Sequence, residues 1–381
     1  MAKVVVLRAE TYDVEQLYQK LSYGFDQLGG IESIIAKDKT ILVNPNMLVA
    51  IDPAAAATTH PAVFEALVRL LVEHDYRVIY GDSPGFGNPK WVARKTGMLD
   101  VGERYGLSLA DFSNGKTVHF PDGVIAKQFE IANAVFESDA IINLAKMKSH
   151  AFQRITGAIK NPFGCVVGFQ KGLMHGRYTD AYHFAEMLVD LNRYLKVDFH
   201  IMDGIVAMEG NGPRNGKPVP MNVIMMSTDP VAIDTLFCQM VNLNPKLIPT
   251  ITYGHKQGIG NYEDIEVVGD AIDNFINRTF DIDRDTIKRS EKSKFTLLRK
   301  HVIRRPYIKQ DTCRKCGVCV DVCPLEDKAV NWDEDDKSIP PIYDYDKCIR
   351  CYCCQEMCPY HAIETKTPLL GKVAYGLRLL K

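Results

Sequence analysis

Nine of the eleven cysteines lie between residues 313 and 358, and their spacing is regular. They include two runs of the form C-x2-C-x2-C-x3-C-P, the second repeating the spacing of the first. Gaps of two residues let one short loop place three thiolates around an iron–sulfur cubane, while the fourth cysteine of such a run ligates the other cluster. The spacing therefore predicts two 4Fe-4S clusters with crossed ligands: one is held by Cys313, Cys316, Cys319 and Cys358, and the other by Cys348, Cys351, Cys354 and Cys323.

Structural zinc is the alternative occupant, because it also takes four thiolates. Zinc sites use separated C-x2-C pairs, whereas each run here has three cysteines at successive two-residue gaps. Cys353 is surplus to the pattern; it is expected to fill space beside a cluster, with a redox role as the alternative. Cys165 and Cys238 are expected to be buried apolar side chains. The crowding of cysteines favours metal binding in a reducing compartment over disulfides.

A second group of residues suited to chemistry follows the apolar run Ala140–Leu144, which is a candidate strand. Lys146, Lys148 and His150 alternate along the chain, so in an extended segment they point to one face. Ligands of α/β domains bind at the carboxyl ends of parallel strands, and a neighbouring turn adds charge and hydrogen bonds. The pattern predicts a site for an anionic carboxylate or phosphate, made by Lys146, Lys148, Lys160, Asn161 and Thr156.

His150 is the candidate proton donor at this site, because histidine titrates near working pH, and Lys148 is the other candidate catalytic residue. The alternative is that the lysines are a solvated strand end and His150 is a surface histidine. Four carboxylates also follow strand-like runs and could bind a metal or pair with the lysines, although Asp229 before Pro230 also fits a helix cap. They are Asp203, Glu209, Asp229 and Asp234.

The glycine pairs at Gly85-x-Gly87 and Gly210-x-Gly212 complete no known phosphate loop. The sequence therefore predicts no nicotinamide or nucleotide site. Binding of a flavin, or of another small molecule that needs no sequence motif, remains an alternative.

Residues 1 to about 270 alternate strand-like apolar runs with helical patterns, which predicts an α/β domain with a mostly parallel sheet. Helices are expected at 13–28, from residue 59 through 71, at 182–195 and at 231–241. Strands are expected at 4–7, 40–43, 77–80, 140–144, 199–202, 223–226 and 265–268. A small α+β ferredoxin-like domain with two clusters is expected to follow.

Changes in composition divide the chain into an α/β domain at 1–280, a linker at 281–305, a two-cluster domain at 306–365 and a tail at 366–381. Residues 288–305 hold eight basic side chains and one acidic one, whereas residues 306–365 hold seven basic and twelve acidic side chains. Opposite charges should draw the linker onto the module or onto a partner. The tail is expected to pack on the protein, with a membrane-surface helix as the alternative.

The net charge of −1 gives no chain-wide signal for nucleic acid or a membrane surface. The apolar run Val4–Leu7 is too short for a signal peptide or a membrane span. We therefore expect a cytoplasmic protein with no transmembrane segment and no nucleic-acid partner.

The cysteine-rich part, residues 306–365, resembles bacterial-type two-cluster ferredoxins. Residues 3–270 resemble the domain-of-unknown-function family numbered 362, whose members often carry such a module at the C-terminus. The resemblance rests on N143-L-A-K-M-K-S-H150 and T156-G-A-I-K-N-P-F-G164, supported by G81-D-S-P84, D203-G204, E209-G-N-G-P213, S227-T-D-P230 and Asp234. Members carry a lysine where this chain has Asn44, which weakens a charge-based role for that loop.

Two functions fit these features. The first is an iron–sulfur oxidoreductase of anaerobic metabolism, in which the clusters pass low-potential electrons to an anionic substrate or cofactor in the α/β domain. The second is a non-catalytic electron carrier or maturation factor that docks on a larger redox enzyme. A redox partner protein is expected in either case.

Overall fold

The computed structural model describes residues 1–287 and 304–370, and these form two compact units. The large unit comprises Met1–Lys171 and Ala185–Thr286, while the small unit combines Gly172–Phe184 with the chain from Ile287 onward. A segment from the middle of the sequence therefore belongs to the small unit. Much of the expected linker and of the expected tail, at 288–303 and 371–381, lies outside the described residues.

One sheet of nine strands organises the described part of the large unit. Five strand pairs are parallel and three, which involve β10 or β8, are antiparallel, so the expected mostly parallel α/β sheet is confirmed. The spatial order is β11 (Ile265–Gly269), β1 (Ala2–Arg8), β10 (Lys217–Ser227), β9 (Phe199–Glu209), β7 (Ala140–His150), β2 (Thr40–Pro45), β3 (Arg77–Tyr80) and β4 (Ser108–Leu109), with β8 (Arg154–Thr156) paired to β7.

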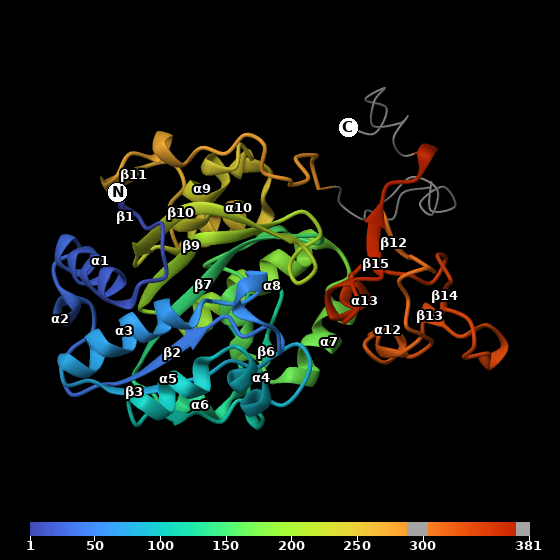
Figure 1. Cartoon of the computed structure of the whole chain (residues 1–381), viewed down its shortest axis with the longest axis horizontal. Helices are drawn as coiled ribbons and strands as arrows, with labels where there is room; N and C mark the ends of the chain where they lie inside the picture. Colours follow the sequence, from blue (N-terminus) through green and yellow to red (C-terminus); the bar gives the residue numbers. More distant parts are fainter. Residues whose placement is uncertain (288–303, 371–381) are drawn as a thin grey trace. The chain divides into compact units, whose positions relative to one another are not determined.

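Helices cover both faces of this sheet (Figure 1). One core is formed with α1 (Val14–Gln27), α3 (Pro61–Glu73) and α5 (Met98–Arg104), and the other with α8 (Ala181–Leu195), α9 (Pro230–Met240) and α10 (Pro249–Lys256). In β1, Val5 and Leu7 enter the first core, whereas Val4 and Val6 enter the second. A strand whose successive side chains point to opposite faces must be apolar throughout when both faces are covered.

The helix starts carry the capping residues that their sequences predict. Asp13 accepts a hydrogen bond from the Gln16 backbone N–H at α1, and Pro61 occupies the first turn of α3. Asp229 caps α9 by accepting from the Ala232 N–H at 2.8 Å, which confirms its alternative role as a helix cap. The remaining elements of the large unit are α2 (Ile31–Ile34), η1 (Pro53–Ala55), α4 (Pro89–Lys95), β5 (Gly115–His119), β6 (Gln128–Ala132), α6 (Asn133–Phe136), η2 (Asn161–Cys165), α7 (Gly168–Arg177, shared with the small unit), η3 (Pro245–Leu247) and η4 (Ile272–Phe275).

The C-terminal part of the small unit is built from short elements around its cysteines. Two antiparallel ribbons pair β12 (Arg305–Ile308) with β15 (Ile363–Lys366) and β13 (Val330–Asn331) with β14 (Ile342–Tyr343). Two short helices, α12 (Val318–Asp321) and α13 (Cys353–Met357), and the turn η6 (Asp333–Asp335) complete it. Its apolar core consists largely of cysteines with Ala329, Val330, Ala362 and Ile363. A core this small needs a metal or another cross-link to be stable.

Candidate cluster-binding cavities and a buried polar network

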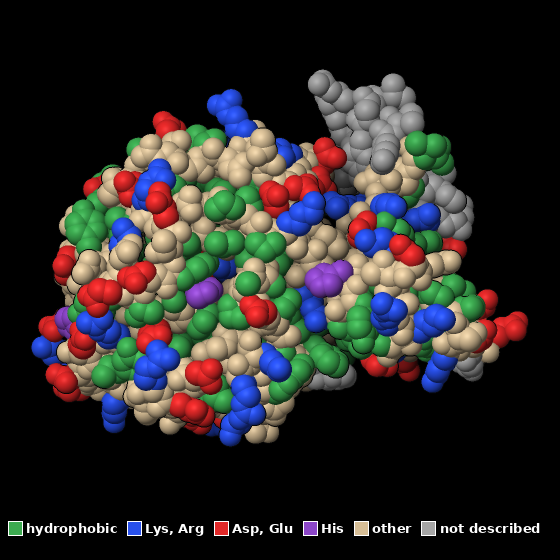
Figure 2. All heavy atoms as spheres, viewed as in Figure 1, with side chains coloured by type: hydrophobic (Ala, Val, Ile, Leu, Met, Phe, Trp, Pro, Cys, Tyr) green, Lys and Arg blue, Asp and Glu red, His purple; other side chains and the backbone are tan. Residues whose placement is uncertain are grey.

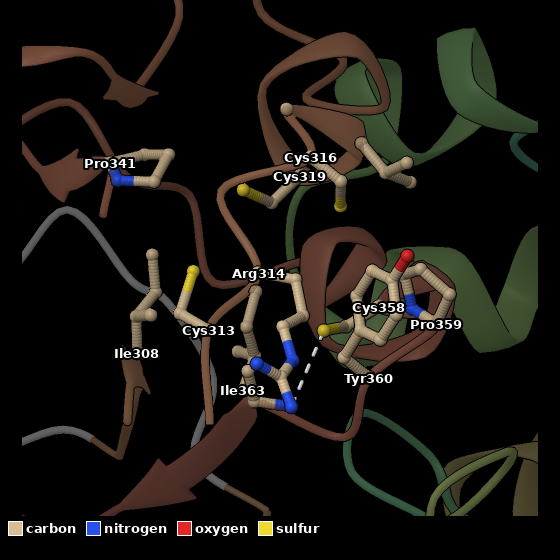
Figure 3. A pocket seen from close by; sticks show the side chains of 13 residues that line it. Ile308, Cys313, Arg314, Cys316, Cys319, Pro341, Cys358, Pro359, Tyr360 and Ile363 are labelled. Carbon is tan, nitrogen blue, oxygen red and sulfur yellow. Dashed lines mark hydrogen bonds between the residues drawn. The ribbon is translucent and has the colours of Figure 1, made fainter. Parts of the chain in front are cut away.

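Cavity A is a partly open pocket of about 320 Å³ that is lined by four cysteines from distant parts of the sequence. In Figure 3 the sulfur atoms of Cys313, Cys316, Cys319 and Cys358 face a common central space. The first two lie on the loop before α12, the third lies in α12, and Cys358 follows α13. Apolar side chains, including Ile308 and Ile363, form much of the remaining wall, which also contains Arg314.

Cavity B has the same volume, about 320 Å³, and is lined by Cys323, Cys348, Cys351 and Cys354. Cys323 belongs to the first run of the sequence but lines the cavity of the second run, while Cys358 does the reverse. The structure therefore brings together the same two crossed sets of four cysteines that the motif spacing predicts.

The two loops share a backbone shape that explains how three consecutive cysteines face one cavity. In the first run Lys315 and Gly317 have φ of 54° and 80°, and at the matching positions of the second run Arg350 and Tyr352 have φ of 65° and 63°. Left-handed residues turn the chain sharply, so cysteines three apart can point to the same side. Three of these four residues are not glycine, and a non-glycine residue keeps this left-handed conformation only where the surrounding structure requires it.

The donor set of each cavity fits an iron–sulfur cluster. Burial, with the charges of neighbouring cysteines, raises the pKa of the Cys319 thiol to about 12, and burial also raises the pKa of Cys348. Four thiolates without a cation would repel one another in this setting, so metal binding must release the thiol protons. Eight cysteines arranged as two apolar cavities are the ligand pattern of two clusters.

Two side chains that contact the cysteines of cavity B were not expected from the sequence; Tyr343 lines the cavity, whereas Arg350 is not among its lining residues. The Tyr343 hydroxyl lies 3.1 Å from Cys354 Sγ, and Arg350, which is 4% exposed, donates from Nη1 to the Cys348 carbonyl oxygen at 2.7 Å. In cavity A, Cys313 Sγ accepts the backbone N–H of Lys315 at 3.4 Å, and Cys358 Sγ accepts that of Ala362 at 3.3 Å. The position of Arg350 among the cysteines of the second run is a sequence signal that could have identified it. The contact of Tyr343 has no such signal, because it depends on how β14 packs.

The other cysteines lie where the sequence predicts. Cys165 and Cys238 are fully buried, as expected. Cys353 is buried at the first residue of α13, and its pKa is raised by a hydrogen bond with Cys351 and by burial. Its burial beside the ligand set agrees with the expected filler role.

The lysines of the second group lie inside β7, which continues six residues past the expected strand end, from Leu144 to His150. Lys146 donates from Nζ to Asp203 Oδ2 at 2.7 Å and to the Tyr12 hydroxyl at 3.1 Å, and the Lys146 and Asp203 side chains are 1% and 0% exposed. Burial lowers the pKa of Lys146, whereas the nearby Asp203 carboxylate raises it. Burial also raises the pKa of Tyr12.

His60 stacks on Tyr12 with ring centroids 3.6 Å apart. Burial lowers the pKa of His60 to about 4.

Lys148 belongs to a network of buried amides. Its Nζ donates to Asn46 Oδ1 at 2.9 Å and to the Ala57 carbonyl oxygen at 2.7 Å. Asn161 accepts from Asn46 Nδ2 at 2.7 Å and donates to Asn143 Oδ1 at 2.7 Å. The structure thus brings Lys148 and Asn161 together through Asn46, an intermediate that the sequence did not single out.

The remaining residues of the predicted anion site have other surroundings. His150 is buried and its Nδ1 accepts the backbone N–H groups of Phe152 and Gln153, at 3.0 and 3.2 Å. Thr156 pairs with Lys148 across β7 and β8, and the Lys160 ammonium lies 5.8 Å from the centre of the Phe163 ring. The alternative of a solvated strand end with a surface histidine is wrong, because these β7 side chains are buried.

The carboxylates divide by role. Asp203 pairs with Lys146, which was one of its two expected roles. Asp234 accepts from the backbone N–H groups of Ala158 and Ile159, and burial raises its pKa to about 7. Glu209 accepts from the Asp281 N–H at 2.8 Å.

Comparison with known proteins identifies both parts of the chain. The model of the domain of unknown function DUF362 matches residues 41–239, and that of a 4Fe-4S dicluster domain matches residues 312–362. A thylakoid-associated protein of Synechocystis sp. is 32% identical over 257 residues, which is 67% of this chain and 79% of that protein. In residues 1–287 and 304–370, no helix has the length and apolar content needed to cross a membrane.

Solved structures are more distant. The lactate racemase apoprotein of Thermoanaerobacterium thermosaccharolyticum has a TM-score of 0.41 at 11% identity, and the match covers 61% of this chain and 56% of the racemase chain. A Thermotoga maritima protein has a TM-score of 0.32 at 14% identity, over 56% of this chain and 55% of its own. Likeness at this level carries no argument about activity. From its sequence matches, the chain belongs to the DUF362 family and carries a 4Fe-4S dicluster domain of ferredoxin type at its C-terminal end.

Proposed function

We propose that this protein is an electron-transfer protein that holds one 4Fe-4S cluster in cavity A and another in cavity B. The observation that supports this most directly is the pair of cavities, each lined by four cysteines that come from both runs of the sequence. When bound, each cluster supplies a centre that accepts and releases one electron. The chain provides eight thiolates and largely apolar cavity walls.

Metal analysis of anaerobically prepared full-length protein tests this proposal. We expect about eight irons and about eight acid-labile sulfides per chain, because each cavity has ligands for one cubane. The reduced protein should show the electron paramagnetic resonance (EPR) spectrum of two interacting clusters. About four irons or fewer, or stoichiometric zinc, would contradict it.

The oxidoreductase hypothesis adds an acceptor in the large unit. Its support is the concentration of buried charge at the carboxyl end of β7, where parallel sheets bind ligands. An anionic substrate there would meet Lys146, Lys148, Asn161 and Thr156, with Lys160 half-buried nearby and His150 as proton donor. Such a ligand must compete with Asp203 for Lys146 and with Asn46 for Lys148.

The second candidate function is a non-catalytic electron carrier that docks on a larger redox enzyme. It is favoured because a ligand would have to compete with Asp203 and Asn46 for the lysines. The ammonium groups of Lys146 and Lys148 are already engaged by oxygen atoms of the protein, which is what a structural scaffold requires. On the face drawn in Figure 2, basic and acidic side chains are interspersed over the large unit. Mass spectrometry of small molecules that co-purify anaerobically separates the two candidates, because only the first predicts a stoichiometric ligand of the large unit.

A further inference from the structure

Five exposed side chains form a basic and aromatic face on α4 of the large unit and on the loop that precedes it (Figure 1). They are Phe86, Lys90, Trp91, Arg94 and Lys95, and we name them the α4 face. Val92 and Ala93, on the opposite side of the helix, are fully buried in the first core and attach α4 to the large unit. We propose that the α4 face binds the acidic dicluster domain, residues 306–365, of a second copy of this chain.

The helix itself does not account for the charges of the α4 face. Arg94 and Lys95 suit the last turn of a helix, where the helix dipole favours cations, but Lys90 lies in the first turn, where the dipole disfavours them. Lys90 and Arg94 are also like charges four residues apart, a spacing that destabilises a helix. In the part of the chain that the structure describes, none of these three cations forms an ion pair. The α4 face therefore offers three cations to a negatively charged partner.

The aromatic side chains supply what the cations lack, which is apolar area for a partner to bury. Phe86 and Trp91 are 46% and 45% exposed. The Trp91 ring lies against the backbone of Gly87, because a Cβ on that glycine would be 3.0 Å from two carbons of the ring. A ring held in this way loses little conformational entropy on binding. Tryptophan and arginine are also the residue types that dominate binding free energy at protein interfaces.

The dicluster domain complements the α4 face in charge. Residues 306–365 hold twelve acidic and seven basic side chains, so this domain is negative before any cluster is counted. Basic side chains outnumber acidic ones in residues 288–303 and 371–381, so neither of those segments complements the face. Nucleic acid fits less well, because tight binding to it usually requires more phosphate contacts than three cations supply.

A second copy can also use the contact twice. If the α4 face of each copy binds the dicluster domain of the other, the pair closes with two-fold symmetry and contains the same contact in duplicate. The second contact then forms within an existing complex, which raises the overall affinity. The inference goes beyond the proposed function, because it requires only the charge of residues 306–365.

Sedimentation velocity of the full-length protein tests the proposal, because binding of a second copy makes the sedimentation coefficient rise with protein concentration. We expect a dimer at about 0.05 M salt and a monomer at about 0.5 M salt, since salt screens the charges between the copies. A monomer at every concentration in low salt overturns the inference. Iron is measured in the same samples, so a chain that dimerises without clusters contradicts the proposed function alone.

Variants of the α4 face test its residues against matched controls. Trp91→Ala should weaken the dimer about tenfold or more, whereas Tyr23→Ala, at an equally exposed ring on α1, should not. Lys90→Glu combined with Arg94→Glu should abolish the dimer in low salt, and Lys256→Glu, at an exposed lysine of α10, should leave it unchanged. If Trp91→Ala does not fold, the charge variant decides. A charge variant that still dimerises like the wild type overturns the inference.

Cross-linking identifies the occupant of the face. A carbodiimide joins ammonium groups to carboxylates that contact them, and an equal mixture of unlabelled and heavy-nitrogen-labelled protein separates links between copies from links within one chain. We expect links of mixed isotope composition from Lys90 or Lys95 to carboxylates of residues 306–365. Links within one chain only, or to carboxylates outside those residues, overturn the inference. So does binding of fluorescent single-stranded DNA by a monomeric wild type that the charge variant loses, which assigns the face to nucleic acid.

Discussion

The dicluster domain and the large unit use buried polar groups in different ways. In the first, two sets of four cysteine thiols each line one cavity, whereas the buried lysines of the second contact Asp203, Asn46 and Ala57 directly. Four thiols that line one cavity are a ligand set for a cluster, while the lysines already have oxygen partners within the protein. This comparison makes cluster binding the better supported function and leaves the anion site of the large unit as a prediction.

The largest expected effect is at the crossed ligand Cys323. Cys323→Ala should remove the cluster of cavity B and lower the iron content by about four per chain, because each cubane needs four thiolates. Cavity A should keep its cluster and its EPR signal. The control is Cys353→Ala, at the cysteine beside Cys354 that is not expected to be a cluster ligand. This variant should keep all the iron. Loss of the cavity A signal with that of cavity B intact would disprove the crossed arrangement.

The next effect tests whether the polar network of the large unit is structural. Asp203→Ala leaves the Lys146 ammonium buried without its carboxylate, and breaking a buried pair in this way costs about 3–5 kcal/mol of unfolding free energy. Glu32→Ala, which removes one partner of the exposed Lys37–Glu32 pair, should change the unfolding free energy far less, because solvent screens that pair. Urea unfolding followed by circular dichroism measures both. Equal effects would show that the buried pair does not hold the fold.

Lys148→Ala separates binding from structure at the same network. If the large unit binds an anion there, affinity for inorganic phosphate measured by calorimetry should fall about ten- to a hundredfold, because a charge-assisted hydrogen bond contributes about 1.5–3 kcal/mol. Iron content should not change. Lys90→Ala, at an exposed lysine of the large unit, should leave both unchanged. No phosphate binding by the wild type, together with a less stable Lys148→Ala protein, would favour the scaffold.

A smaller effect concerns acid stability. Burial lowers the pKa of His200 to about 3, below its ordinary value of 6.5. The folded state therefore holds this histidine neutral, so its stabilising contribution is complete above pH 6.5 and is lost as pH falls toward 3. Between about pH 7.5 and about pH 5 we expect a loss of about 2 kcal/mol of unfolding free energy from this group. His200→Gln should reduce that pH dependence in urea unfolding; an unchanged slope would show that other groups cause it.

Much of the fold follows from local patterns. The expected strand at 77–80 coincides with β3, and the helices expected at 13–28 and 182–195 match α1 and α8 within about two residues. Alternation and helical spacing are properties of short segments, so they can be read without knowing what those segments pack against. The predicted end of β7 was wrong, because charged residues end the apolar run at that point. Pairing with β9 and β8, which a local pattern does not show, extends the strand to His150.

The sequence by itself determined the cysteine sets, the order of the strands and helices along the chain, and the near-neutral charge. Ligand spacing and periodicity are encoded within a few residues, so no tertiary information is needed to interpret them. Only the tertiary structure decided that Lys146 faces Asp203, that Tyr343 reaches Cys354, and that Arg350 is buried with its guanidinium on the Cys348 carbonyl oxygen. The first contact joins β7 to β9, the second joins β14 to α13, and the third depends on packing. The chemistry of these side chains is therefore set by burial and by partners that no local pattern specifies.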